Sequence, residues 1–170
     1  TSSAAQALLV GNSAGYAVIV EGKVPNEEGL LSHNKTANRI YQHLLDRGFA
    51  AGNIYYYNYN TSQPGVTGAP SRANVQNAIE TLVKNKMNSV ASPLWVIMVD
   101  HGGPEKFYMA NESITPADLD LWLSNLEQNL NATALQEKRI VVIGACYSGS
   151  FIPELSSAAT ATNAGRLIIT

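Results

Sequence analysis

Apolar residues gather in short runs along the chain, and glycine, proline or polar residues bound each run. Residues 93–100 (PLWVIMVD) and 139–145 (RIVVIGA) are continuous apolar runs, which are typical of central parallel strands covered on both faces. Residues 16–22 (YAVIVEG) predict another buried strand, and residues 53–58 (NIYYYN) a half-buried edge strand. Residues 166–170 (RLIIT) predict the start of one more strand.

Between these strands, apolar positions recur at helical spacing. The first predicted helix starts at His33 and ends near Gly48, which fits a C-terminal cap. Ser71 is expected to cap a second helix. The buried face of that helix is expected to hold Val75, Ile79, Leu82 and Val83. A third helix follows Thr115, which forms a capping box with Asp118.

The remaining segments are short connections. Residues 61–70 predict a loop by their composition, and residues 106–113 predict a small hairpin. Because strands and helices otherwise alternate, the sequence predicts an α/β fold, a three-layer sandwich with a mostly parallel central sheet and helices on both faces. One domain is expected over residues 16–170. Residues 1–15 are an N-terminal segment that either adds an edge strand or ends an upstream region.

Composition and charge narrow the function classes. The chain has 170 residues, of which 45% are apolar and 14% charged, and its net charge of −2 argues against a nucleic-acid partner. No apolar run reaches the roughly 20 residues of a membrane-spanning helix, so no membrane span is expected. One cysteine excludes an internal disulfide framework and zinc sites built from paired cysteines. The dispersed histidines show no H-x-x-x-H spacing, so no metal site is expected.

The location of the protein has only compositional support. Sequons for N-glycosylation occur at Asn34, Asn60, Asn111 and Asn131. Several are expected by chance in so Asn-rich a chain, so they are weak support for a protein outside the cytoplasm. A first residue other than methionine fits a processed chain.

Two reactive side chains follow the two predicted central strands. His101 follows the first of these strands, and Cys146, the only cysteine, follows the second. Sites in open α/β sheets form at the carboxyl ends of the strands, so neighbouring strands would bring both residues to one edge. A thiol is mostly protonated at neutral pH, and a nearby imidazole can take its proton. A backbone N–H of Gly102 or Gly103, together with that of Cys146, is a candidate for an oxyanion hole.

Each of these residues also has an ordinary explanation. A single cysteine at a strand end is more often structural, and a single histidine there more often lies on the surface. Their joint appearance at the ends of two central strands favours a catalytic pair. A glutamine-amidotransferase elbow, Gly-x-Cys-x-Gly, is disfavoured because Ser148 fills its last position and every histidine precedes Cys146.

The motifs DHGG (100–103) and ACYSGSF (145–151) resemble those of the caspase-like (clan CD) cysteine peptidases, nearest the legumain-type C13 family. The resemblance covers the strand and helix order from about residue 16 to residue 170 and is specific only at these two motifs. It implies a caspase-like sandwich with His101 and Cys146 as the catalytic dyad and Gly102 helping to bind the oxyanion. It further implies that a peptide or protein substrate is cleaved through an acyl-enzyme, without a cofactor.

The chain departs from legumain at the substrate pocket. The family carries an arginine near the start of its first helix, where this chain reads LLSHNKT (30–36), and an acidic residue where this chain has Gly144. Asparagine specificity is therefore not carried over. The residues expected to line the pocket are Ser32, His33, Gly144 and Ser148. Further pocket residues of the family follow the last strand, so the domain is expected to be incomplete, with a C-terminal continuation or a small-subunit partner.

The roles of two further residues, His33 and Asp100, stay open. His33 can line the pocket or orient His101, although a helix-capping pair with Asn34 is the more ordinary interpretation. Asp100 precedes His101 within a predicted strand, so its side chain is expected to point away from His101.

A cysteine endopeptidase is the favoured function. The alternatives are a catalytically silent caspase-fold scaffold and a transpeptidase that uses the same dyad.

Overall fold

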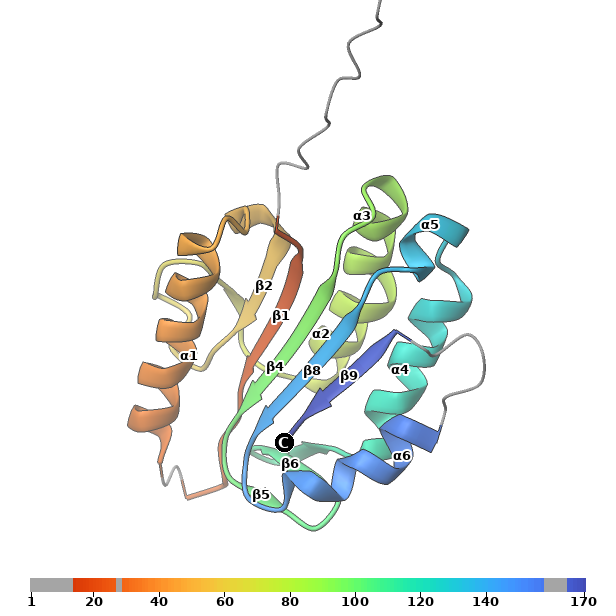
Figure 1. The fold of residues 1–170 in the computed structure, drawn as a ribbon. Coiled ribbons are helices and arrows are strands. Elements are labelled where there is room, and N and C mark those ends of the chain that lie inside the picture. The colour runs from red at the N-terminus through yellow and green to blue at the C-terminus, as the bar shows by residue number, and fades with distance from the viewer. Residues whose placement is uncertain (1–13, 27–28, 158–164) are drawn as a thin grey trace, which may run out of the picture.

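A parallel sheet forms the middle layer of the protein, whose computed structural model describes residues 14–26, 29–157 and 165–170 (Figure 1). The strand order is β3-β2-β1-β4-β8-β9, and all neighbours in it are parallel. These strands are β1 (Tyr16–Glu21), β2 (Ile54–Tyr57), β3 (Val66–Gly68), β4 (Leu94–Val99), β8 (Arg139–Gly144) and β9 (Arg166–Ile169). A small antiparallel sheet consists of β5 (Gly102–Gly103), β6 (Lys106–Met109) and β7 (Glu112–Ile114).

Helices cover both faces of the main sheet, as predicted (Figure 1). One face carries α1 (Leu30–Asp46), and the short 3-10 helix η1 (Ala51–Asn53) follows α1 and precedes β2. The elements on the other face are α2 (Arg72–Asn77), the π-helical η2 (Ala78–Val83), α3 (Lys84–Ser89), α4 (Pro116–Gln128), α5 (Ala132–Leu135), η3 (Ser148–Phe151) and α6 (Ile152–Ser157). Within the described residues, no helix is both long enough and apolar enough to cross a membrane.

The strand β1 shows why the central strands read as unbroken apolar runs. Its side chains alternate between the two faces of the sheet. Ala17 and Ile19 join the core beneath α1, whereas Val18 and Val20 join the larger core on the opposite face. Both faces are covered, so every residue of β1 is buried and no polar alternation appears.

The predicted helix caps are confirmed. The Ser71 side chain accepts a hydrogen bond from the Asn74 N–H at 3.1 Å and caps α2. Thr115 and Asp118 form the predicted capping box at the start of α4. Asp118 also accepts hydrogen bonds from the Arg72 guanidinium, which ties the start of α4 to α2.

Several boundaries differ from the sequence-based expectation. The first helix begins at Leu30 rather than His33, because Gly29, with φ of 77°, takes the N-cap position in the left-handed region. Part of the expected loop at 61–70 forms β3, which pairs with β2, so the prediction that residues 53–58 form an edge strand is wrong. Leu82 is only half-buried on its helix, whereas Val83 and Met87 are buried. The proposed structure of residues 1–13 lies outside the described residues.

The strand register brings the chemistry-bearing ends to one edge of the sheet. Glu21 at the end of β1 is level with Val99 at the end of β4, and Val99 is level with Gly144 at the end of β8. The Asp100 N–H extends this ladder by donating to the Gly144 carbonyl at 3.3 Å. The segments that follow β1, β4 and β8 therefore leave the sheet side by side.

Candidate active site

The two motif residues follow neighbouring parallel strands. His101 lies two residues beyond the end of β4, and Cys146 lies two residues beyond the end of β8. His101 is half-buried, and Cys146 is a free, exposed cysteine. The condition that the sequence left open, that the two strands be neighbours, is met, so both residues sit at the same carboxyl edge.

The backbone of Gly102 packs directly against the Cys146 segment. A Cβ atom at Gly102 would overlap the carbonyl oxygen of Cys146 and would lie 3.0 Å from the Ala145 side chain. Only glycine therefore allows the segment after His101 to approach the segment that carries the thiol. The backbone of the DHGG motif therefore packs directly against the backbone of the ACYSGSF motif.

A tight turn presents the cysteine. Tyr147, the next residue, adopts a left-handed φ of 57°, and the Ser148 N–H donates to the Ala145 carbonyl at 3.3 Å. Ser150 anchors the far side of the turn. Its hydroxyl donates to the Tyr147 carbonyl at 2.7 Å and accepts from the Glu105 N–H at 2.8 Å. The exposed thiol therefore sits on a backbone that is fixed from both sides.

A cluster of two imidazoles and a carboxyl lies beside this turn. The rings of His33 and His101 meet edge to face with their centroids 4.9 Å apart. The His33 Nδ1 lies 3.1 Å from the Asp100 Oδ1. Gly29 encloses the cluster, because a Cβ there would lie 2.7 Å from the His101 Nε2. The first turn of α1 thus holds His101 on the side away from solvent.

Burial sets the protonation of this cluster. The pKa of Asp100 is raised to about 6 by its removal from water, which outweighs the opposing effect of the His101 backbone and charge. The pKa of His33 is lowered, first by burial and then by the nearby His101. Burial therefore favours the neutral form of His33 and makes Asp100 easier to protonate than a solvent-exposed aspartate.

These contacts correct two expectations. His33 was expected to form a capping pair with Asn34, but the N-cap is Gly29 and His33 contacts His101 and Asp100 instead. The Asp100 side chain was expected to point away from His101, yet both residues contact His33. The alternation of strand side chains no longer applies because β4 ends at Val99.

We expect Asp100→Asn to change how stability depends on pH. Between pH 4 and pH 6 the folded protein holds a proton on Asp100 that the unfolded chain releases, so this group makes wild-type stability fall as pH rises through that window. Asn does not titrate. The stability of Asp100→Asn relative to wild type should therefore rise by about 2 kcal/mol from pH 4 to pH 8. Urea unfolding at both pH values measures it.

The exposed carboxyl of Asp46, at the far end of α1, supplies the matched control as Asp46→Asn. A relative stability of Asp100→Asn that stays constant between pH 4 and pH 8 would contradict the raised pKa of Asp100.

The other expected pocket residues are dispersed. The Ser32 hydroxyl donates to the Gly29 carbonyl at 2.8 Å, so it serves the start of α1. Gly144 is exposed at the end of β8, and Ser148 is buried beneath the turn after Cys146. Among these candidates, His33 is the one that contacts His101.

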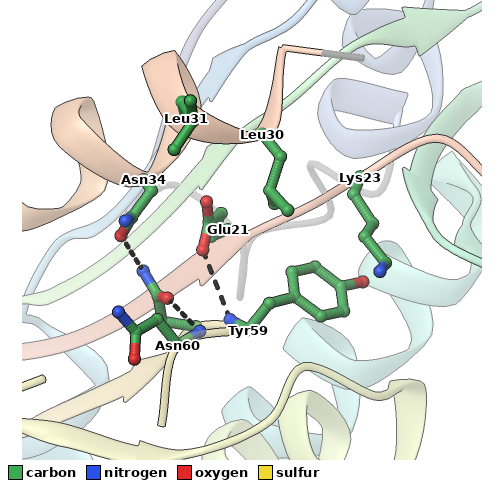
Figure 2. A pocket seen from close by; sticks show the side chains of 8 residues that line it. Glu21, Lys23, Leu30, Leu31, Asn34, Tyr59 and Asn60 are labelled. Atoms are coloured by element: carbon green, nitrogen blue, oxygen red, sulfur yellow. Dashed lines mark hydrogen bonds between the residues drawn. The ribbon is translucent and has the colours of Figure 1, made fainter. Parts of the chain in front are cut away.

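Glu21 was missed by the sequence analysis. It ends β1, is fully buried and lines a pocket beside the first turn of α1 (Figure 2). The sequence did offer a sign that Glu21 lies near the site: it is a charged residue at the end of an otherwise apolar strand. The carboxyl ends of parallel strands are where sites form in such sheets. Within the described residues, no group of three or more histidine, cysteine, aspartate or glutamate side chains could hold a metal ion.

Comparison with protein-family models gives a match. Residues 67–166, more than half of the chain, match the model of the peptidase C13 family. His101 and Cys146 both lie within the matched segment. No curated protein matches the chain.

Proposed function

Because this chain belongs to the peptidase C13 family, a family of cysteine peptidases, we propose that it is an endopeptidase with His101 and Cys146 as its catalytic dyad. One observation carries the proposal. The two residues follow neighbouring parallel strands at the same sheet edge, and the backbone of Gly102 packs against the Cys146 segment. The α/β sandwich with its parallel central sheet agrees with a caspase-like fold.

In the proposed reaction, His101 takes the proton from the Cys146 thiol as the sulfur attacks the substrate carbonyl carbon. The nitrogen that accepts this proton is Nδ1, since the Nε2 is buried against Gly29 and His33. The carbonyl oxygen becomes an oxyanion that accepts hydrogen bonds from the N–H groups of Gly102 and Cys146.

The tetrahedral intermediate then collapses. The carbon–nitrogen bond breaks, and His101 gives its proton to the leaving amine, which leaves an acyl group on Cys146. Water next gives a proton to His101 and attacks the thioester carbon. The sulfur–carbon bond breaks and the thiolate regains its proton. His33 acts as a positioning residue, because its ring, 4.9 Å from that of His101, limits the orientations of the catalytic imidazole.

Intact mass spectrometry tests the dyad. The full chain is incubated with peptides that carry a thiol-reactive electrophile, each with a different residue next to it. We expect one adduct per chain, absent in Cys146→Ala and slowed in His101→Ala, with a rate that depends on the peptide. His43→Ala is the matched control. His43 is an exposed histidine in the last turn of α1, whereas His33 lies in the first turns of the same helix.

Two results would overturn the proposal. Labelling of Cys146 at a rate that ignores both the peptide and His101 would identify an ordinary exposed thiol. Failure of every probe to label the folded full chain would leave the caspase-fold scaffold as the better reading.

A further inference from the structure

An exposed aromatic ring stands directly beside the proposed nucleophile. Tyr147 follows Cys146 in the chain and is 66% exposed. In the described part of the chain, every other phenylalanine, tyrosine and tryptophan is buried or half-buried. The mechanism proposed above gives Tyr147 no role, so its place next to the thiol needs a separate explanation.

The backbone of Tyr147 adopts a conformation that is unfavourable for a tyrosine. Its φ of 57° and ψ of 14° lie in the left-handed region. There the Cβ atom crowds the backbone, so glycine or asparagine is the usual residue. Because the ring is exposed, packing against the described residues compensates little of this strain. Strained residues of this kind cluster at functional sites, where a contact with a ligand is a reason to keep them.

Hydrogen bonds hold the Tyr147 turn in place. The Tyr147 carbonyl accepts bonds from both the backbone N–H of Ser150, at 2.9 Å, and its hydroxyl, at 2.7 Å. The same hydroxyl accepts a bond from the Glu105 N–H at 2.8 Å. Glu105 is itself a non-glycine residue with a left-handed φ, of 56°. The backbone that carries the ring is therefore fixed before a substrate arrives, which lowers the entropy lost on binding.

The position of this turn indicates which half of a substrate the ring meets. In the proposed reaction His101 gives its proton to the leaving amine, so the substrate residues after the cleaved bond begin beside His101. The segment after His101 contains Gly102, whose backbone packs against the Cys146 carbonyl, and Glu105, which is bonded to Ser150. Tyr147 is thus fastened to the loop that faces the leaving half of the substrate.

We propose that the Tyr147 ring contacts the side chain of the substrate residue directly after the cleaved bond and selects an aromatic or large aliphatic side chain there. The assignment rests on the proposed peptidase function. Such a contact removes apolar area of both side chains from water. A second ring gains a further edge-to-face or offset contact. A carboxylate loses water and meets the negative face of the ring, so an acidic residue is disfavoured.

Kinetics with matched peptides test the contact. The residues before the bond are those preferred by the electrophilic probes, and Phe, Leu, Ala or Glu stands directly after it. For wild type we expect Phe and Leu to raise kcat/KM about fivefold or more over Ala, and Glu to lower it. In Tyr147→Ala the ratio of Phe to Ala should fall to about onefold. Tyr147→Phe should keep the wild-type ratios, because the ring and not the hydroxyl makes the contact.

Three controls accompany this comparison. Ratios within each variant cancel any change in its general activity. Val90→Ala removes an apolar side chain that is 51% exposed and precedes β4, at the opposite edge of the sheet, so it should keep every ratio. The urea midpoint of Tyr147→Ala should stay close to that of wild type, since the ring is exposed. A large fall of this midpoint would show that the ring serves packing, which contradicts the proposal.

The side of the substrate is tested separately. The same four residues are placed two positions before the bond, where Tyr147→Ala should leave their ratios unchanged. If Tyr147→Ala changes the ratios there and not after the bond, the ring lies along the other half of the substrate and the assignment is wrong. Loss of the preference in Tyr147→Phe would assign the selection to the hydroxyl and overturn the ring contact.

The failures of the two proposals are distinguishable. A reporter peptide that releases a fluorescent amine has no residue after its cleaved bond, so its hydrolysis reports the dyad alone. If wild type cleaves the reporter but cleaves the Phe, Leu, Ala and Glu peptides equally, the role of Tyr147 is wrong and the dyad stands. If wild type cleaves neither the reporter nor the peptides, the proposed function fails and the role of Tyr147 falls with it.

Discussion

Cys146→Ala should lower kcat/KM for peptide hydrolysis by at least about 10³-fold, because the reaction loses its nucleophile. His101→Ala should produce a loss of similar size, since the thiol then keeps its proton and the leaving amine receives none. Residues that act as one unit do not contribute additively. The double variant should therefore have a kcat/KM close to that of the less active of the two single variants. Hydrolysis of the best probe-derived peptide, followed by product chromatography, measures all three.

The structure supplies controls for this comparison. Cys146 is exposed, so Cys146→Ala should leave the unfolding midpoint close to that of wild type. His43→Ala should keep full activity. A Cys146→Ala protein with more than about one tenth of wild-type activity would contradict thiol catalysis. Losses of Cys146→Ala and His101→Ala that multiply in the double variant would show that the two residues act independently.

Glu127→Ala should destabilise the protein by about 3–5 kcal/mol, because it leaves two buried guanidinium groups without their shared counter-ion. Glu127, on α4, accepts bonds from the Arg139 Nε at 3.0 Å and from the Arg166 Nη2 at 2.9 Å. All three side chains are at most 3% exposed. Arg139 and Arg166 begin β8 and β9, so this cluster fastens α4 to two strands of the sheet.

Urea and thermal unfolding measure the effect, and the thermal midpoint of Glu127→Ala should fall by about 10 °C. Asp46→Ala removes a carboxyl that is 60% exposed on α1, so it should change stability by less than about 0.5 kcal/mol. Similar losses in Glu127→Ala and Asp46→Ala would mean that the buried cluster contributes no more than a surface pair. The double replacement of Glu127 and Arg139 by Met should recover part of the loss, because it removes both partners of one pair.

Local sequence determined much of the fold. The central strands followed from unbroken apolar runs, since a strand buried on both faces has no polar positions to alternate. The helix starts at Ser71 and Thr115 followed from side chains that bond the backbone of their own first turn. These interactions join residues close together in the chain. The same reasoning located His101 and Cys146 at strand ends, although their catalytic roles stay a prediction.

Contacts between distant segments decided the rest. No local sequence pattern predicted that β3 would pair with β2, because a three-residue strand forms only where its partner strand is already in place. The contact of His33 with Asp100 joins the first turn of α1 to the end of β4, and the approach of Gly102 to Cys146 joins two separate loops. The pocket above Glu21 needs β1, α1 and the segment after β2 together. The sequence by itself determined which side chains stand at strand ends; the tertiary structure decided which of them meet, because strand order and packing set those distances.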